Sequence, residues 1–145
     1  MMNATAIKVG AGAWMFTGVV HDILEFVLRG DPAMDAALRA STIQVGPVSL
    51  NAESLTRGVS LAMGLAMFVV GLLLWMITRA VPAERLRPFG IVALVASLAA
   101  LGLAIILIPG PPVITFAVAS IAFVIALATR SRNRSGTQPL PAAAR

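Results

Sequence analysis

The chain has no cysteine and no tyrosine, and charged residues make up only 12% of its 145 residues. Without cysteine, disulfide bonds and thiolate metal sites are excluded, and the redox compartment is left open. Soluble domains carry about 25% charged residues, so this chain has about half of the charge that a water-facing surface needs. Aromatic residues are also few, at 6%, which argues against an aromatic-walled ligand cavity. These absences exclude an ordinary soluble globular protein.

The chain is rich in apolar residues instead, and four apolar stretches are long enough to cross a membrane. They cover about residues 6–28, 55–78, 89–108 and 113–129. A hydrocarbon core of ~30 Å needs about 17–25 residues, and the last stretch is at the lower limit. We expect an all-α integral membrane protein whose transmembrane domain, residues 1–130, is an up-down-up-down bundle of four helices. The basic, proline-containing residues 131–145 are expected to form a disordered cytoplasmic tail.

The basic residues flank the apolar stretches and set the expected orientation. With the N-terminus inside, eight basic residues lie on the inner side, and three, Arg29, Arg39 and Arg57, lie on the outer side. The reverse orientation would invert that ratio against the positive-inside preference. We therefore expect both termini in the cytoplasm, and abundant alanine and arginine with little lysine indicates a bacterial inner membrane. The expected partner of this +5 chain is the lipid bilayer and not nucleic acid, because the basic residues border the spans.

The outer segment between the first two stretches, residues 30–51, carries its own structural signals. Asp31 followed by Pro32 is typical of a helix start, so a short helix is expected over residues 33–40. Residues 43–50 then alternate apolar and polar side chains around a Gly-Pro turn, which predicts a small extended excursion over the outer mouth of the bundle. Asn51 is expected to cap the second span, with an acidic residue in its first turn.

Small residues and short connectors predict how the helices pack. Stripes of small residues let helix backbones approach in lipid. The candidates are Gly58, Ala62 and Ala66, with Ser60 and Gly64 offset beside them, and Ala96, Ala100 and Ala104. The short connectors at residues 80–88 and 109–112 predict antiparallel neighbours. Trp14 and Trp75 lie near the cytoplasmic ends of their spans, where tryptophan commonly anchors at the headgroup level.

Three ionisable residues, His21, Asp22 and Glu25, lie inside the first apolar stretch. A charge in hydrocarbon costs at least a few kcal/mol, and such residues usually face a bundle interior or a cavity and mark functional sites. Their spacing puts them on one broad helix face with Trp14 and Thr17. In the expected orientation they fall in the outer third of the membrane, within reach of a cavity open to the outer surface.

Several interpretations of this cluster stay open. Asp22 and Glu25 can pair with Arg29 and Arg57 at the outer boundary, with His21 hydrogen-bonded in support. Alternatively, the cluster is the polar anchor of a pocket for a lipid or a hydrophobic small molecule. The candidate ligand-binding residues are then His21, Asp22, Glu25, Thr17, Trp14 and Arg57. Metal sites of helix bundles take ligands from several helices, and here a single span offers them, so we expect no metal and no cofactor.

These observations favour a non-catalytic membrane protein that binds a lipid or hydrophobic small molecule, or that acts as a small subunit of a larger membrane-protein complex. One rival is an intramembrane isomerase that acts on a lipid, with Glu25 as the acid and His21 as its partner. Another is a transporter or channel. A channel would require oligomerisation, because a single polar helix offers too little lining for a pore.

Two resemblances rest on the same residues. Residues 18–26, Gly-Val-Val-His-Asp-Ile-Leu-Glu-Phe, followed by three more apolar stretches and an Ile108-Pro109 turn, resemble small bacterial four-span families. Those families have a Gly-x-x-His near the outer end of the first helix and no assigned function. The shorter His-x-x-x-Glu of residues 21–25 is similar to the emopamil-binding protein and EXPERA family, where such residues serve sterol isomerisation or ligand binding. That similarity implies such a role for His21 and Glu25 alone.

Overall fold

The computed structural model describes residues 3–28, 30–107 and 110–129, and this part of the chain is helical apart from one small hairpin. Its elements are α1 (Ala4–Val27), α2 (Pro32–Ala40), β1 (Thr42–Val45), β2 (Val48–Asn51), α3 (Ala52–Ala80), the 3-10 helix η1 (Ala83–Arg85), α4 (Arg87–Leu107) and α5 (Pro111–Ala128). The predicted all-helical class is confirmed. Arg29, the Ile108-Pro109 turn and the predicted tail, residues 131–145, lie outside the described residues.

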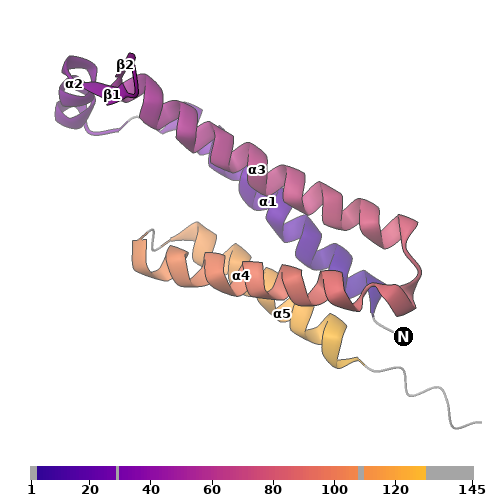
Figure 1. The fold of residues 1–145 in the computed structure, drawn as a ribbon. Helices are drawn as coiled ribbons and strands as arrows, with labels where there is room; N and C mark the ends of the chain where they lie inside the picture. The colour runs from indigo at the N-terminus through magenta and orange to yellow at the C-terminus, as the bar shows by residue number, and fades with distance from the viewer. Residues whose placement is uncertain (1–2, 29, 108–109, 130–145) are drawn as a thin grey trace, which may run out of the picture.

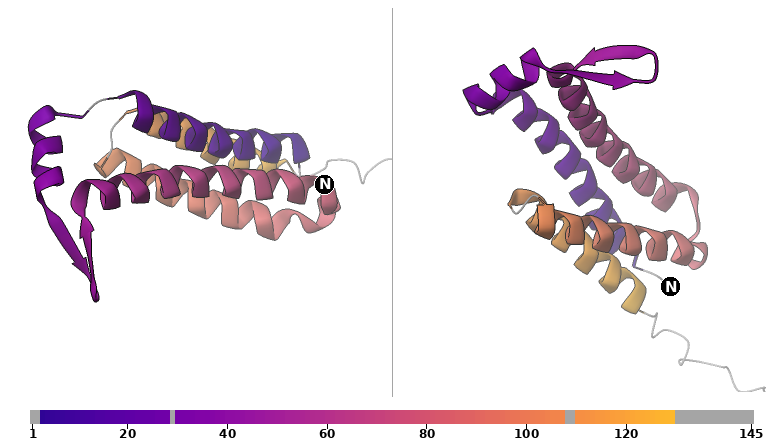
Figure 2. Two further views of the ribbon diagram at one scale, coloured as in Figure 1. Left: turned by 90° about the horizontal axis from the view of Figure 1, so that it is seen from above. Right: turned by 60° about the vertical axis from the view of Figure 1, so that its left-hand side comes forward.

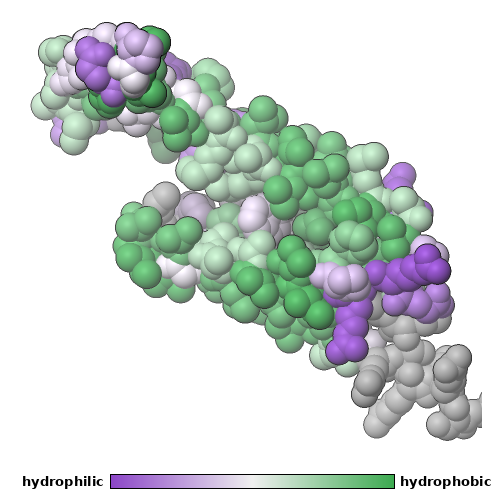
Figure 3. All heavy atoms as spheres, in the orientation of Figure 1, coloured by the Kyte–Doolittle hydropathy of each residue, from purple (hydrophilic) through white to green (hydrophobic). Residues whose placement is uncertain are grey.

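Three helices, α3, α4 and α5, are long and apolar enough to cross a membrane. Helix α1 meets the same criterion only as a pair with α2, to which it is bent by 88°, so the described residues hold three or, with this pair, four candidate spans. On the face that Figure 3 shows, hydrophobic side chains cover the middle of the molecule and hydrophilic ones gather toward its two ends. This distribution is that of a multi-pass membrane protein. The predicted stretches match the long helices closely, the largest difference being a start at residue 55 where α3 begins at Ala52.

The long helices are arranged as two pairs. The most extensive contacts join α1 to α3, α1 to α5, and α4 to α5. Figure 1 and the right-hand view of Figure 2 show that the α1/α3 pair and the α4/α5 pair meet near the N-terminus of α1 and diverge toward the opposite end. Helix α1 therefore connects the two pairs, whereas the short connector after α3 had predicted that α3 and α4 would pack as neighbours.

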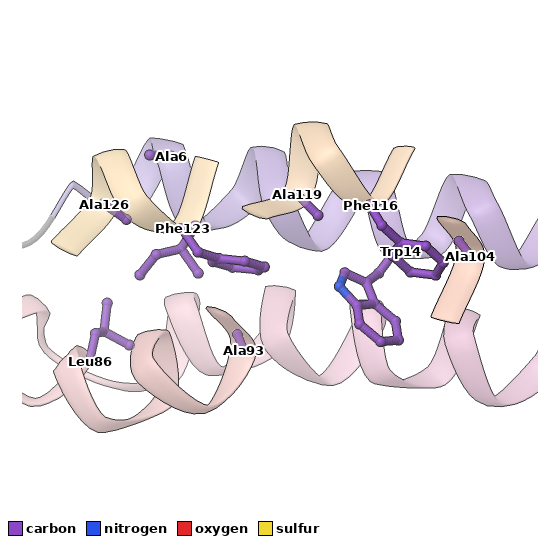
Figure 4. Close-up of a cluster of buried hydrophobic side chains, with 10 residues drawn as sticks. Ala6, Trp14, Leu86, Ala93, Ala104, Phe116, Ala119, Phe123 and Ala126 are labelled. Carbon is purple, nitrogen blue, oxygen red and sulfur yellow. The ribbon is translucent and has the colours of Figure 1, made fainter. Parts of the chain in front are cut away.

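The hydrophobic core lies where the two pairs meet (Figure 4). Phe123 of α5 and Leu86, just before α4, are fully buried, and Ile7 of α1 is 2% exposed. Gly10 makes room for the aromatic ring, since a Cβ at Gly10 would lie 2.6 Å from the Cζ of Phe123. Burial of Leu86 fixes the connector between α3 and α4 against the core, although the sequence marks that connector only as a short basic loop.

Trp14 lies in the same core, which corrects its prediction as a membrane-interface anchor. Its side chain is 9% exposed, and its indole Nε1 donates a hydrogen bond of 2.8 Å to the Oγ of Ser97 on α4. Its ring meets that of Phe116 on α5 edge-on, with 5.1 Å between centroids (Figure 4). A buried tryptophan N–H needs an acceptor. Trp14 therefore links α1 to both helices of the other pair.

Glycine sets the closest approach of α1 and α3. Gly18 and Gly64 are both buried. A Cβ on Gly18 would collide with the carbonyl oxygen of Gly64 and would lie 2.7 Å from the backbone nitrogen of Phe68. Such backbone proximity supplies the van der Waals contact that holds helices together in lipid. The stripe of small residues that was predicted from Gly58 onward is exposed, and the offset Gly64 makes the contact instead.

The outer segment forms the predicted short helix and extended excursion. Asp31 caps α2, and β1 and β2 pair antiparallel around a two-residue turn. In that turn Gly46 has a φ of 60°, a backbone conformation that glycine adopts readily. Asn51 caps α3 by accepting from the backbone N–H of Glu53, and its Nδ2 donates to the carbonyl oxygen of Arg39 at 3.0 Å. Asn51 thereby ties the end of α2 to the start of α3.

Candidate functional site

The polar residues of α1 lie on the side of the helix that faces α3. His21, Asp22 and Glu25 are each partly buried, whereas Ile23 and Phe26, which flank them in sequence, are exposed. Residues three and four apart share a helix face, so one packed face of α1 takes all three ionisable groups. Their partners lie on α3. One of these partners is a residue that the sequence had indicated only as a small packing residue.

Ser60 of α3 connects Glu25 and His21. The Oγ of Ser60 donates a hydrogen bond of 2.8 Å to Oε2 of Glu25. The Nε2 of His21 lies 3.1 Å from the same Oγ and 3.2 Å from the carbonyl oxygen of Ser60. Both ionisable residues therefore contact a single hydroxyl group, and Ser60 joins the two in one polar network.

The geometry of this network assigns its protons. A carbonyl oxygen can only accept a hydrogen bond, so the Nε2 of His21 carries the hydrogen and donates it toward Ser60. The hydroxyl hydrogen of Ser60 is then directed to the Glu25 carboxylate. Every link runs in one direction, from His21 through Ser60 to Glu25. Such an arrangement holds the Glu25 carboxylate in one position.

Asp22 lies deeper along the same interface, against Gly64. One of its carboxyl oxygens, Oδ1, is buried and has no hydrogen-bond partner among the described residues. A Cβ at Gly64 would collide with this oxygen and would lie 2.6 Å from the Cγ of Asp22. The missing side chain at Gly64 therefore creates the space that Asp22 occupies.

An open cavity of about 500 Å³ lies between the end of α1, the helix α2 and the first turns of α3. Glu25 lies in its wall, and Ser60 and His21 support the Glu25 side chain from the α1/α3 interface. Charged and apolar side chains share the lining. They are Glu25, Asp35, Glu53, Arg39 and Arg57, with Phe26, Leu28 and Leu38 among the apolar ones. The cavity adjoins the polar outer segment at one end of the apolar helices.

The charges around the cavity pair differently from the predicted arrangement. Arg39 and Glu53 form the one ion pair found among the described residues, with 3.1 Å between Nε and Oε2. Arg57 had been a predicted partner of Asp22 and Glu25, but its guanidinium lies over the ring of Phe26, 5.4 Å from the centroid. Glu25 is hydrogen-bonded to Ser60 instead. The pairing with Arg29 falls on a residue outside the described part of the chain.

The six predicted site residues thus separate into four locations. Glu25 and Arg57 line the cavity, whereas His21 and Asp22 lie behind it in the α1/α3 interface. Thr17 is buried further along, with its hydroxyl donating to the carbonyl oxygen of Ala13 in its own helix. Trp14 belongs to the core described above.

Ser60 is a site residue that the sequence did not identify as one. A serine inside an apolar helix is common at packing positions, and its local sequence gave no sign of a partner on another helix. The available signal was its position one turn before Gly64, on the side of α3 that approaches α1. That position indicates a role in the site only when it is known which helix packs against α3.

The site offers no cluster of metal ligands, since no three His, Cys, Asp or Glu side chains within residues 3–28, 30–107 and 110–129 lie close enough to hold an ion. Comparison with protein families, curated proteins and solved structures finds no match to this chain. The resemblances drawn from residues 18–26 accordingly stay predictions.

Proposed function

We propose that this integral membrane protein binds a lipid or hydrophobic small molecule in the cavity at the outer end of α1, with Glu25 as its polar anchor. One observation carries the proposal. The Glu25 carboxylate lies in the wall of an open cavity of about 500 Å³ and is held there by the Ser60 hydroxyl. Small-molecule sites commonly combine a cavity of this size with a few fixed polar groups among apolar side chains.

The cost of placing Glu25 in a largely apolar helix supports a binding role. Ionisable groups in such a position are expensive and are rare unless they serve a function. A purely structural role would be best met by an ion pair, and within the described residues Glu25 contacts the neutral hydroxyl of Ser60. Among the described residues the Glu25 carboxylate thus has no ion-pair partner, and it is suited to anchor a ligand that enters the cavity.

We also propose that both termini face the cytoplasm of a bacterium, which puts the cavity at the outer surface of the inner membrane. The support is the distribution of positive charge, with eight basic residues on the proposed inner side and three on the outer side. The positive-inside preference favours this orientation. The ligand then comes from the outer leaflet or from the external solution.

Native mass spectrometry of the protein, extracted gently from its own membranes, tests the binding role. We expect a bound small-molecule mass on the wild-type protein and its loss from the His21→Ala/Glu25→Gln double variant. Replacing the carboxylate removes the anchor, and replacing the imidazole removes the group that orients Ser60. Glu84→Gln is the matched control, because Glu84 is an exposed carboxylate in η1, outside the cavity.

The other outcomes separate the rival functions. A co-purifying polypeptide in place of a small molecule would indicate a subunit of a larger complex. A ligand that is chemically converted by the wild-type protein, and bound unchanged by Glu25→Gln, would indicate the isomerase. Wild-type protein with no bound mass, under conditions that preserve its fold, would contradict the proposal.

A further inference from the structure

We infer that the cavity binds the headgroup of a zwitterionic bilayer lipid with a primary amine, as in an ethanolamine phospholipid. This inference rests on the proposed function and names the class of ligand for the same site. It is carried by the charges that line the cavity, by the way two of them are held, and by the position of the cavity at the edge of the apolar surface.

The cavity wall holds both signs of charge. The lining residues that the structure describes include three carboxylates, Glu25, Asp35 and Glu53, and two guanidinium groups, Arg39 and Arg57, which sum to a net charge of −1. Arg39 and Glu53 pair with each other, so two carboxylates and one guanidinium of this lining have no ion-pair partner among the described residues. A ligand that complements them carries one anionic and one cationic group. A phosphate and an ammonium joined by a short linker fit this description.

Arg57 binds the phosphate of the proposed headgroup. Its guanidinium lies over the face of the Phe26 ring at 5.4 Å from the centroid, and a cation–π contact of this kind restrains the plane of the guanidinium. The guanidinium fork matches the oxygens of a phosphate, which it binds by charge-assisted hydrogen bonds. Phe26 thus orients Arg57 at the cavity wall before any ligand arrives.

Glu25 and Asp35 bind the ammonium of the proposed headgroup. The Glu25 carboxylate is fixed by Ser60, and Asp35 stands in the first turn of α2 on another side of the cavity. A primary ammonium donates up to three hydrogen bonds and can reach more than one carboxylate. The trimethylammonium of choline has no N–H to donate, and an anionic glycerol headgroup brings no cation. The site therefore distinguishes ethanolamine from both.

The surroundings of the cavity favour a lipid over a dissolved molecule of the same chemistry. Phe26 and Leu28 line the cavity and are 65% and 66% exposed. They continue the exposed apolar surface of α1 toward Ile23, which is 53% exposed. A headgroup in the cavity would leave its acyl chains against this surface, so the lipid buries apolar area that a free phosphoethanolamine leaves exposed.

Lipid competition tests this inference directly. Delipidated wild-type protein is placed in micelles with equal amounts of ethanolamine, choline and glycerol phospholipids that share the same acyl chains, and the retained lipids are counted by native mass spectrometry. We expect the ethanolamine lipid to be retained over each of the others by at least about tenfold, the ratio that one charge-assisted hydrogen bond supports. Glu25→Gln should abolish this preference, because it removes a carboxylate that accepts from the ammonium. Arg57→Ala should instead lower the retention of all three lipids, because each carries the phosphate, and Arg57→Lys should keep part of that retention. Arg79→Ala is the matched control, an arginine at the opposite end of α3.

The inference and the proposed function fail in different ways. Equal retention of the ethanolamine and choline lipids, still lost in Glu25→Gln, would overturn the headgroup assignment and leave lipid binding intact. Preference for the glycerol lipid would also overturn it. Retention of no lipid by the wild-type protein would contradict lipid binding itself. Displacement of the lipid by an equal concentration of free phosphoethanolamine would overturn the commitment to a membrane lipid.

Discussion

Gly64 lies between two groups that leave no room for a side chain at this position. On one side the backbone of Gly18 approaches it, and on the other the Asp22 carboxyl group occupies the space where a Cβ would stand. The same glycine therefore permits the close packing of α1 on α3 and the burial of a carboxyl group beside the polar network. Packing and site geometry depend on one missing methyl group.

We expect Gly64→Ala to lower the free energy of unfolding by about 1–3 kcal/mol, the usual cost of overpacking a tight contact. It should also displace Asp22 and so weaken ligand retention. Unfolding in mixed micelles, followed by circular dichroism against increasing denaturing detergent, measures the first effect. Gly58→Ala is the control on the same helix, because nothing lies within 4 Å of a Cβ there. A Gly64→Ala protein as stable as Gly58→Ala would show that the close approach does not contribute to stability.

Individual residues were predictable where a local rule applied to them. Asp31, Asn51 and the Gly46 turn act as their local sequence indicates, since capping and turn formation depend on neighbours in the chain. Ser60 and Trp14 differ, because their partners are more than 30 residues away, Glu25 for the first and Ser97 for the second. Their roles depend on which helices pack against each other, and the local sequence does not indicate those helix pairs.

Among the elements, the long helices were predictable because hydropathy alone sets their length. Their packing was less so. The connector between α3 and α4 is short, yet the extensive contacts of α3 are with α1, and those of α4 are with α5. Helices in a membrane gain no hydrophobic energy by associating, so close contacts and interhelical hydrogen bonds decide which pairs form. The hydrogen bond from Trp14 to Ser97 joins one pair to the other.

We expect Ser97→Ala to cost about 1–3 kcal/mol of unfolding free energy, because it leaves the buried indole N–H of Trp14 without an acceptor. Trp14→Phe in the same background should then cost less than it does in the wild type, and a double-variant cycle on unfolding measures this coupling. Ser120→Ala is the control. Ser120 is also buried, at 5% exposed, and its Oγ has no partner among the described residues. Equal costs at Ser97 and Ser120 would contradict a stabilising role for the hydrogen bond.

At the scale of the whole molecule, the acidic residues are concentrated at one end. Five of the six, all except Glu84, lie between residues 22 and 53, at the end of α1, in the outer segment and in the first turn of α3. The connector that holds Glu84 also holds Arg85 and adjoins Arg87, and is therefore basic overall. Figure 3 shows hydrophilic side chains at both of these ends with apolar surface between them. The two ends of the molecule therefore differ in charge.

This asymmetry yields a prediction about crossing and orientation together. Because the chain has no cysteine, a single introduced thiol reports its own position without background. Gln44 in β1 and Glu84 in η1 are both exposed and lie on either side of α3 along the chain. In spheroplasts, a membrane-impermeant maleimide should label Gln44→Cys at once and should label Glu84→Cys only after permeabilisation. The reverse pattern would overturn the proposed orientation and keep α3 as a span, whereas equal labelling of both before permeabilisation would show that α3 does not cross.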